Sequence, residues 1–193
     1  MWAAHVSTPT LPGRTTRTGT TLWLTGLPSA GKTTLALAVA ERLRAAGAEV
    51  EVLDGDEVRT HLSAGLGFSR EDRDTHVTRI GFVAELLARH GVVVLVPVIA
   101  PYESTRQAVR AHHHSHGTGH LQVHLSTPVE VCADRDVKGL YAKAYRGEIS
   151  SMTGVDDPYE IPVDPDLRLD TSTTDLDASV QALLDLLSAK GIL

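Results

Sequence analysis

The stretch GLPSAGKTT, residues 26–34, decides the fold of this chain. Gly26, Gly31, Lys32 and Thr33 fit the pattern G-x-x-x-x-G-K-[ST], in which backbone N–H groups, a lysine and a hydroxyl surround the phosphates of a nucleotide. The pattern requires a buried strand before it and a helix after it. An apolar run at 20–25 predicts the strand, and the apolar-rich stretch 32–46, ended by Gly47, predicts the helix. We therefore expect nucleotide binding by Gly26, Leu27, Pro28, Ser29, Ala30, Gly31, Lys32, Thr33 and Thr34.

Strands and helices are predicted to alternate along the rest of the chain. Further strands are expected at 49–53, 92–99 and 120–125, and helices at 73–90, 105–113, 128–135 and 176–187. Such alternation predicts an α/β fold with a parallel sheet and helices on both faces. Residues 138–165 break the rhythm with scattered Gly and Pro, which is typical of a functional lid. We expect a flexible leader at 1–19 and one domain at 20–193.

The composition excludes several classes of function. The net charge is −6 and no basic block is present, which argues against binding to nucleic acid or anionic membranes. No run reaches the roughly 18–20 apolar residues that span a bilayer. The start of the chain lacks the apolar core of a secretory signal, and the single cysteine, Cys132, cannot form an intrachain disulfide. A cytoplasmic location is therefore expected.

Two carboxylates in LDGDEVR, residues 53–59, are the acidic partners of the phosphate loop. Strand carboxyl ends gather at one crevice in open parallel sheets, so Asp54 and Asp56 should lie near the transferred phosphate. One of them, Asp54 in our assignment, would orient Mg²⁺-bound water, and the other would take a proton from an attacking hydroxyl; the Thr33 hydroxyl would ligate the ion itself. The alternative is a solvated turn, since Asp and Gly favour turns.

A small-molecule kinase is the class that remains. A GTPase would need a guanine-reading Asn-Lys-x-Asp, and the chain contains no asparagine. A motor or helicase would normally be larger and carry further nucleic-acid contacts.

The chain resembles the adenylylsulfate kinases, a family of P-loop kinases. The resemblance runs from residue 20 to about 187 and rests on GLPSAGKTT, LDGDEVR, LGFSREDR, RIGFVAELL, IAPY, PVEVCADRDVKGLYAKA and TGVDDPYE. It implies transfer of the ATP γ-phosphoryl group to the 3′-hydroxyl of adenosine 5′-phosphosulfate, with Mg²⁺, during sulfate activation. The product would be 3′-phosphoadenosine 5′-phosphosulfate. The resemblance also implies a homodimer.

The family's functional residues map onto this sequence by motif. Asp56 becomes the expected base beside Asp54, Lys32 and Lys138 the charge-neutralising lysines, and Arg135 a contact near the ATP adenine. The expected acceptor-binding residues are Asp56, Arg59, Phe68, Arg73, His76, Ile99, Ala100, Lys138, Leu140, Met152 and Thr153. Guanidinium groups suit a phosphosulfate anion, and an aromatic ring such as Phe68 suits a flat base.

Four positions depart from the commonest family pattern, and all are on the acceptor side. His76 replaces an asparagine, Val98 an aromatic residue, Ala100 a serine, and Met152 a phenylalanine. Some family members are proposed to phosphorylate that serine, and an alanine excludes this route. Two alternatives stay open: a related kinase whose acceptor has drifted, and a nucleotide-binding module without catalysis.

The histidine-rich stretch AHHHSHGTGH, residues 111–120, is the last unusual feature. His112 and His116 are four residues apart and share a helix face, as metal-binding pairs do. No matching cysteine or carboxylate cluster accompanies them in the sequence. We expect a solvated helix end here rather than a metal site.

Overall fold

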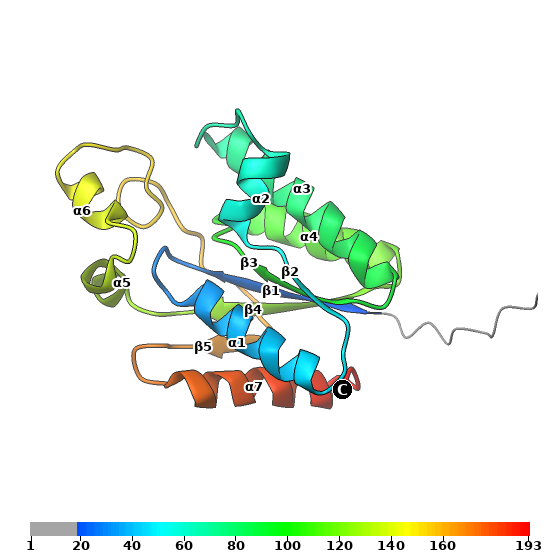
Figure 1. The fold of residues 1–193 in the computed structure, drawn as a ribbon. Coiled ribbons are helices and arrows are strands. Elements are labelled where there is room, and N and C mark those ends of the chain that lie inside the picture. The colour runs from blue at the N-terminus through cyan, green and yellow to red at the C-terminus, as the bar shows by residue number, and fades with distance from the viewer. Residues whose placement is uncertain (1–18) are drawn as a thin grey trace, which may run out of the picture.

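A five-stranded parallel sheet with helices on both faces makes up the computed structural model, which describes residues 19–193 (Figure 1). The predicted leader lies outside these residues except for Gly19. The strands are β1 (Thr20–Gly26), β2 (Val50–Val52), β3 (Val93–Pro97), β4 (Gly119–Leu125) and β5 (Leu167–Leu169). The helices are α1 (Lys32–Ala45), α2 (Gly55–Leu62), α3 (Arg70–Arg89), α4 (Glu103–Ser115), α5 (Val129–Arg135), α6 (Leu140–Tyr145) and α7 (Leu176–Ala189). The predicted fold class is confirmed.

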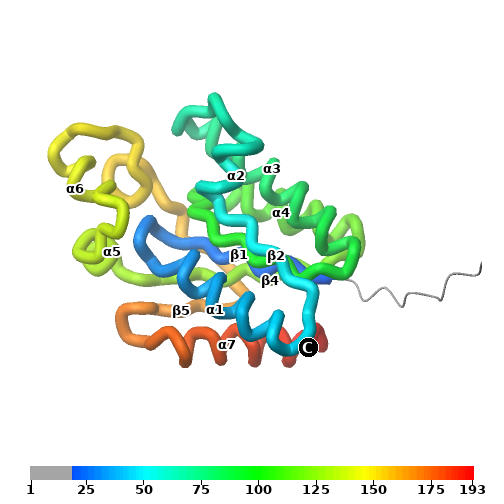
Figure 2. Tube along the Cα trace, in the orientation of Figure 1, coloured from blue at the N-terminus to red at the C-terminus, as the bar shows by residue number. Residues whose placement is uncertain are grey.

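Strand β1 lies at the centre of the sheet, in the order β2-β3-β1-β4-β5. Its side chains alternate between two cores, as the two-residue period of a strand requires. Leu22 and Leu24 pack with α1 and α7 on one face, whereas Trp23 packs with α3 and α4 on the other. The tube trace shows α1 and α7 on one side of the sheet and α3 and α4 on the other (Figure 2). Because both faces are covered, every residue of β1 is buried.

The phosphate loop leaves β1 between its two neighbours, β3 and β4, at their carboxyl ends. A side chain at Gly26 would place its Cβ 2.6 Å from the Leu125 carbonyl oxygen, so only glycine allows this close passage. Gly31 ends the loop in the left-handed region, at φ 92°, and caps α1. These two glycines direct the loop's backbone toward the crevice where ligands of open parallel sheets bind.

Several elements differ from the sequence prediction. Helix α2, strand β5 and helix α6 were not predicted; each is short, and a short element has too few residues to show a period. Helix α3 begins at Arg70 instead of 73 because Ser69 caps it, its Oγ accepting from the Asp72 N–H at 3.1 Å. Strand β3 ends at Pro97, and Ala100, at φ 43°, turns the chain toward α4.

Across residues 19–193 no helix combines the length and the apolar character that crossing a membrane requires.

Candidate active site

The phosphate loop is held in shape by its own lysine. The Lys32 ammonium donates to the carbonyl oxygens of Gly26 at 2.9 Å and Leu27 at 2.7 Å. Burial lowers the pKa of Lys32 to about 8, with the nearby carboxylates of Asp54 and Asp56 opposing the shift. A phosphate group would supply the counter-charge that this lysine lacks.

The two predicted magnesium ligands lie next to each other. The Thr33 hydroxyl donates to Asp54 Oδ2 at 2.7 Å, while Asp54 Oδ1 accepts from the backbone N–H of Asp56 at 2.9 Å. Asp54 is thus the N-cap of α2 rather than part of a solvated turn. A hydroxyl and a carboxylate are hard oxygen donors of the kind Mg²⁺ selects, so this pair fits the ion.

Asp56 projects from the first turn of α2 and forms an ion pair with Lys138. Both side chains are exposed, at 74% and 61% respectively, so water screens their attraction. Lys138 comes from the loop before α6, so the pair spans the cleft. An exposed pair of this kind separates readily when a charged ligand enters.

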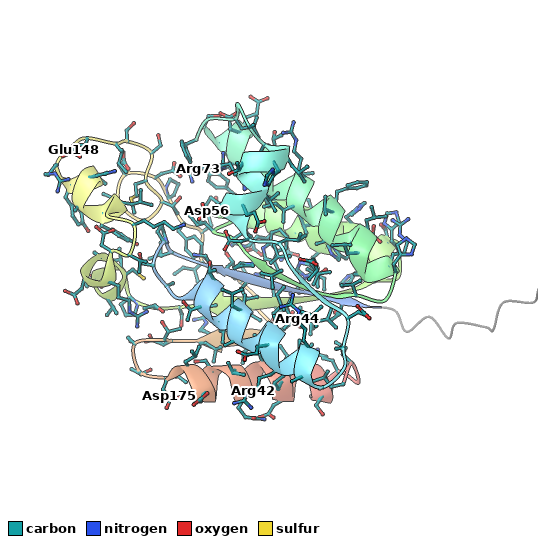
Figure 3. All side chains as sticks on the ribbon, in the orientation of Figure 1. Arg42, Arg44, Asp56, Arg73, Glu148 and Asp175 are labelled. Atoms are coloured by element: carbon teal, nitrogen blue, oxygen red, sulfur yellow. The ribbon has the colours of Figure 1, made fainter. Side chains whose placement is uncertain are left out.

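Arg59, Phe68 and Arg73 form one cluster beside Asp56. The Phe68 ring is 58% exposed, so it is not an ordinary core residue. The guanidinium carbons of Arg59 and Arg73 lie 4.9 Å and 5.6 Å from its ring centroid. An open aromatic ring beside two cations can receive a flat base that carries an anionic group. Figure 3 shows Asp56 and Arg73 on the same side of the molecule, next to α2.

Arg73 also ties the lid segment, residues 138–165, to the body of the protein. Its Nε donates to the Phe68 carbonyl at 2.9 Å, and its two terminal nitrogens donate to Thr153 Oγ1 and the Ser151 carbonyl. Asp157 Oδ2 lies 3.6 Å from Arg73 Nε. Two residues of the motif TGVDDPYE, Thr153 and Asp157, thus contact Arg73. Thr153 is buried and positions Arg73 instead of lining the cleft.

His76 stands in the cleft wall with both ring nitrogens occupied. Nε2 donates to the Gly55 carbonyl at 3.0 Å, and Nδ1, 3.0 Å from Ser63 Oγ, is left to accept from that hydroxyl. Burial, and then the neighbouring Arg59, lower the pKa of His76 to about 4. The ring is therefore neutral and joins α3 to the start of α2, and neither nitrogen is left for a ligand.

The opposite end of the cleft contains Arg135, which the sequence predicted near the ATP adenine, together with residues that it did not predict. Arg135 donates through Nη1 and Nη2 to the side chain and the carbonyl of Thr171, both at 2.7 Å. Thr171 in turn donates to the Ala30 carbonyl of the phosphate loop at 3.0 Å. The segment from Thr171 into α7 also lines the cleft, through Thr174, Asp175, Leu176 and Ser179. The helix predicted at 176–187 was the signal that could have identified Leu176 and Ser179, whereas the short β5 gave none for Thr171.

The lid segment rests on the phosphate loop. The fully buried Tyr141 donates from its hydroxyl to the Pro28 carbonyl at 3.2 Å. Just before the lid, the Val137 N–H donates to Ser29 Oγ at 3.3 Å. These two bonds join the start of this segment to the loop that would hold the nucleotide.

One cleft of about 770 Å³ gathers most of the predicted residues. Its lining includes Pro28, Ser29, Gly31, Lys32, Thr33, Thr34, Asp54, Asp56, Arg59, Phe68, Arg73, His76, Ile99, Ala100, Arg135, Lys138 and Leu140. Gly26, Leu27, Ala30, Met152 and Thr153 are not in the lining; Met152 instead packs in the core that contains α1 and α7.

Comparison with known proteins agrees with this geometry. Residues 18–170 match the family described as Adenylylsulphate kinase. The adenylyl-sulfate kinase of Chloroflexus aurantiacus is 56% identical over 170 residues, which cover 88% of this chain and 89% of that protein. The probable adenylyl-sulfate kinase of Synechocystis is 54% identical over 177 residues, 90% of this chain and 98% of that protein.

A solved structure agrees as well. The structure of the Mycobacterium tuberculosis APS kinase CysC in complex with AMPPNP and APS is 44% identical to this chain, with a TM-score of 0.86. The alignment covers 88% of this chain and 98% of that one. Sequence, fold and site geometry together show that the chain belongs to the adenylylsulphate kinase family.

Proposed function

We propose that the protein transfers the γ-phosphoryl group of ATP to the 3′-hydroxyl of adenosine 5′-phosphosulfate. The products are ADP and 3′-phosphoadenosine 5′-phosphosulfate. The observation that carries the proposal is the single cleft in which the phosphate loop and the cluster of Asp56, Arg59, Phe68 and Arg73 face the same space. The related M. tuberculosis kinase, which binds a nucleotide analogue and APS together, supports this assignment.

The nucleotide half consists of the phosphate loop, Arg135 and the segment from Thr171 into α7. Lys32 and the backbone N–H groups at the start of α1 would bind the β- and γ-phosphates. Thr33 and Asp54 would hold Mg²⁺, which neutralises phosphate charge during transfer. Arg135 and the residues around Thr171 would hold the adenosine end.

The acceptor half consists of Phe68, the two arginines and Asp56. Phe68 would stack on the adenine, and Arg59 would pair with the phosphosulfate. Arg73 has already used three of its donors on the protein, so its contribution is to fix Phe68 and the lid as well as to add positive charge. Ile99, Ala100 and Leu140 complete the wall of this half.

Asp56 would act as the base. As the new bond forms between the 3′-oxygen and the γ-phosphorus, the bond from that phosphorus to the β,γ-bridging oxygen breaks. The hydroxyl proton passes to the Asp56 carboxylate, and Lys138, released from its ion pair, neutralises charge on the transferred group. Ala100 has no hydroxyl, so transfer is direct and in line.

The second candidate is a related kinase whose acceptor specificity has changed to another small molecule. It is favoured by the residues at three cleft positions, His76, Val98 and Ala100. His76 offers no free nitrogen, which removes the amide contact that an asparagine would supply.

The assay that tests the proposal follows ADP release with MgATP and adenosine 5′-phosphosulfate, with the product mass measured in the same sample. We expect acceptor-dependent ADP and a product one phosphoryl group heavier than the acceptor. Protein that binds ATP but releases no acceptor-dependent ADP would contradict the assignment. A screen of other hydroxylated or adenylylated acceptors would then distinguish a kinase that uses another acceptor from a protein that binds nucleotide without catalysis.

Assembly and location are proposed on the family resemblance. We expect a homodimer that acts in the cytoplasm. Light scattering of the purified chain and fractionation of cells would test these two points.

A further inference from the structure

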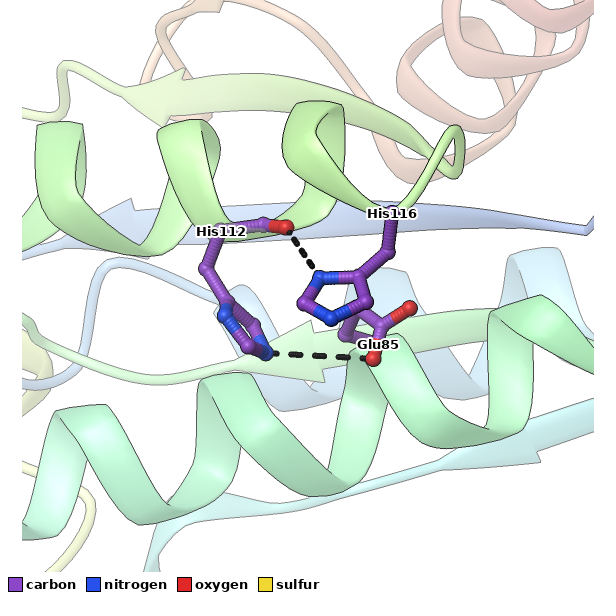
Figure 4. A group of neighbouring side chains, drawn as sticks. All are labelled: Glu85, His112 and His116. Atoms are coloured by element: carbon purple, nitrogen blue, oxygen red, sulfur yellow. Dashed lines mark hydrogen bonds and ion pairs between the residues drawn. The ribbon is translucent and has the colours of Figure 1, made fainter.

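A close contact brings together two helices far from the cleft. Gly81 of α3 packs against Val109 of α4, where a Cβ on the glycine would lie 2.7 Å from Val109 Cγ2. Further along both helices, Glu85 of α3 lies opposite His112 of α4 and His116, the residue that caps α4 (Figure 4). The carboxylate that the histidine-rich stretch lacks in sequence is therefore supplied by another helix.

The three side chains offer their ligand atoms to one point. One nitrogen from each histidine and one Glu85 oxygen all lie within 4.8 Å of one another, and His112 Nε2 is 3.8 Å from Glu85 Oε2. His116 Nδ1 is 2.9 Å from the His112 carbonyl oxygen, so Nδ1 carries the proton. That bond leaves the lone pair on His116 Nε2, the arrangement found in metal-ligating histidines.

One nitrogen of this cluster lacks a partner among the residues that the structure describes. Glu85 is 0% exposed and accepts from Arg89, whose Nε lies 3.1 Å from Oε1 and whose Nη2 lies 2.5 Å from Oε2. His112 Nε2 is buried and has no hydrogen-bond partner within residues 19–193. Buried polar atoms are nearly always bonded, so this nitrogen, 3.8 Å from Glu85 Oε2, favours a ligand shared with the carboxylate.

We propose that Glu85, His112 and His116 form a binding site for a divalent transition-metal ion of the zinc type. Two imidazoles and a carboxylate select Zn²⁺, Ni²⁺ or Cu²⁺ over Mg²⁺ and Ca²⁺, which prefer sets made of oxygen alone. Zinc with two histidines and one glutamate keeps a fourth position for water.

The geometry allows such an ion with small adjustments. At Zn–N distances of 2.0–2.1 Å, tetrahedral ligands lie about 3.3 Å apart. Contacts of up to 4.8 Å must therefore shorten by up to about 1.5 Å, and the side chains with room to move are the exposed His116 and the half-buried His112. Arg89 competes for the Glu85 oxygens, but it is partly exposed and can turn toward solvent.

The site differs in place and chemistry from the nucleotide cleft. In a parallel sheet with crossover helices, the end of a helix lies at the edge opposite the strand carboxyl ends. Glu85, His112 and His116 are near the ends of α3 and α4, whereas Arg73 and His76 at the start of α3 line the cleft. A bound ion would clamp α3 to α4, and this assignment does not depend on the proposed kinase activity.

Zinc titration of the full chain, without an affinity tag and after chelator treatment, tests the proposal. Excess Mg²⁺ in the buffer occupies the hard-oxygen site at Thr33 and Asp54. The test variant is His112→Ala/His116→Ala, and the matched control is His114→Ala, which removes an exposed histidine from the same turn of α4. The readouts are calorimetric stoichiometry and the melting temperature.

We expect one zinc ion per chain for the wild type and the control. At a zinc concentration a hundredfold above Kd, the melting temperature should rise by about 5–10 °C. The double variant should lose this rise, and Glu85→Gln should weaken zinc binding at least about tenfold. The assignment is wrong if the double variant binds zinc as tightly as the wild type, or if the wild type shows no zinc-dependent shift.

Discussion

Replacing Asp56 by asparagine should remove phosphoryl transfer while leaving the fold and nucleotide binding in place. Asparagine keeps the shape of the side chain and the backbone N–H that donates to Asp54. The change removes an exposed ion pair with Lys138, worth about 0.2–1 kcal/mol, and a negative charge near the start of α2, worth about 0.3–1 kcal/mol. The free energy of unfolding should therefore fall by no more than about 2 kcal/mol. Loss of the base should lower kcat by about 10²–10⁴.

Three measurements separate these effects. Acceptor-dependent ADP release gives kcat, titration with a non-hydrolysable ATP analogue gives nucleotide affinity, and urea unfolding gives stability. Glu57→Gln is the matched control because it removes the same charge from the same turn of α2 and does not line the cleft. If Asp56→Asn retains turnover within about threefold of the wild type, or if Glu57→Gln loses as much, Asp56 is not the base.

Other predictions follow from the same contacts. Burial holds the pKa of Lys32 at about 8, and a bound phosphate favours the charged form of this lysine. Affinity for an ATP analogue should therefore fall up to about tenfold per pH unit above pH 8, and a Kd that calorimetry finds constant from about pH 7 to 9.5 would contradict this. His76 has a folded pKa of about 4, below the ordinary 6.5, so its contribution to stability is complete above pH 6.5 and is lost as pH falls toward 4. His76→Asn should flatten the urea-derived stability profile in that window by up to about 1.4 kcal/mol per pH unit, and an unchanged slope would argue against it. Arg73→Lys cannot keep the bonds to the lid, so kcat/KM for the acceptor should fall at least about tenfold and limited proteolysis of residues 151–157 should quicken; unchanged values would show that charge alone suffices. Gly81→Ala should cost about 1 kcal/mol, because overpacking against Val109 at 2.7 Å exceeds the gain in helix propensity, and Val109→Ala in a double-mutant cycle should relieve that cost.

The parts of the fold that local sequence determines were predictable. The strand, loop and helix at 20–46 follow from adjacent residues, because the glycine spacing and the apolar runs act within one turn of chain. Strand β3, which ends at Pro97, was predictable for the same reason, although not its length, since the Ala100 carbonyl in the following turn accepts from Arg106. The short α2 was missed because a single buried residue, Val58, gives no period.

The site residues were predictable where a sequence motif indicates both the residue and its role. They were less predictable where two contacting residues lie far apart in the sequence. Nothing in the sequence places Thr153 against Arg73 or Glu85 against His112, because these pairs join separate elements. Met152 shows a further limit. Its motif position suggested contact with the acceptor, and an apolar side chain serves equally well in the core, where this one packs.

Asp54 links the two halves of the cleft through its two oxygens. Oδ2 accepts from Thr33 at the start of α1, and Oδ1 caps the helix that carries Asp56 and Arg59. A cation held between Thr33 and Asp54 would therefore constrain the carboxylate that sets the start of α2. The positions of the base and of the anion-binding arginine then depend on the occupancy of the phosphate loop. This coupling needs only one side chain and one short helix, both of which directly follow strand β2.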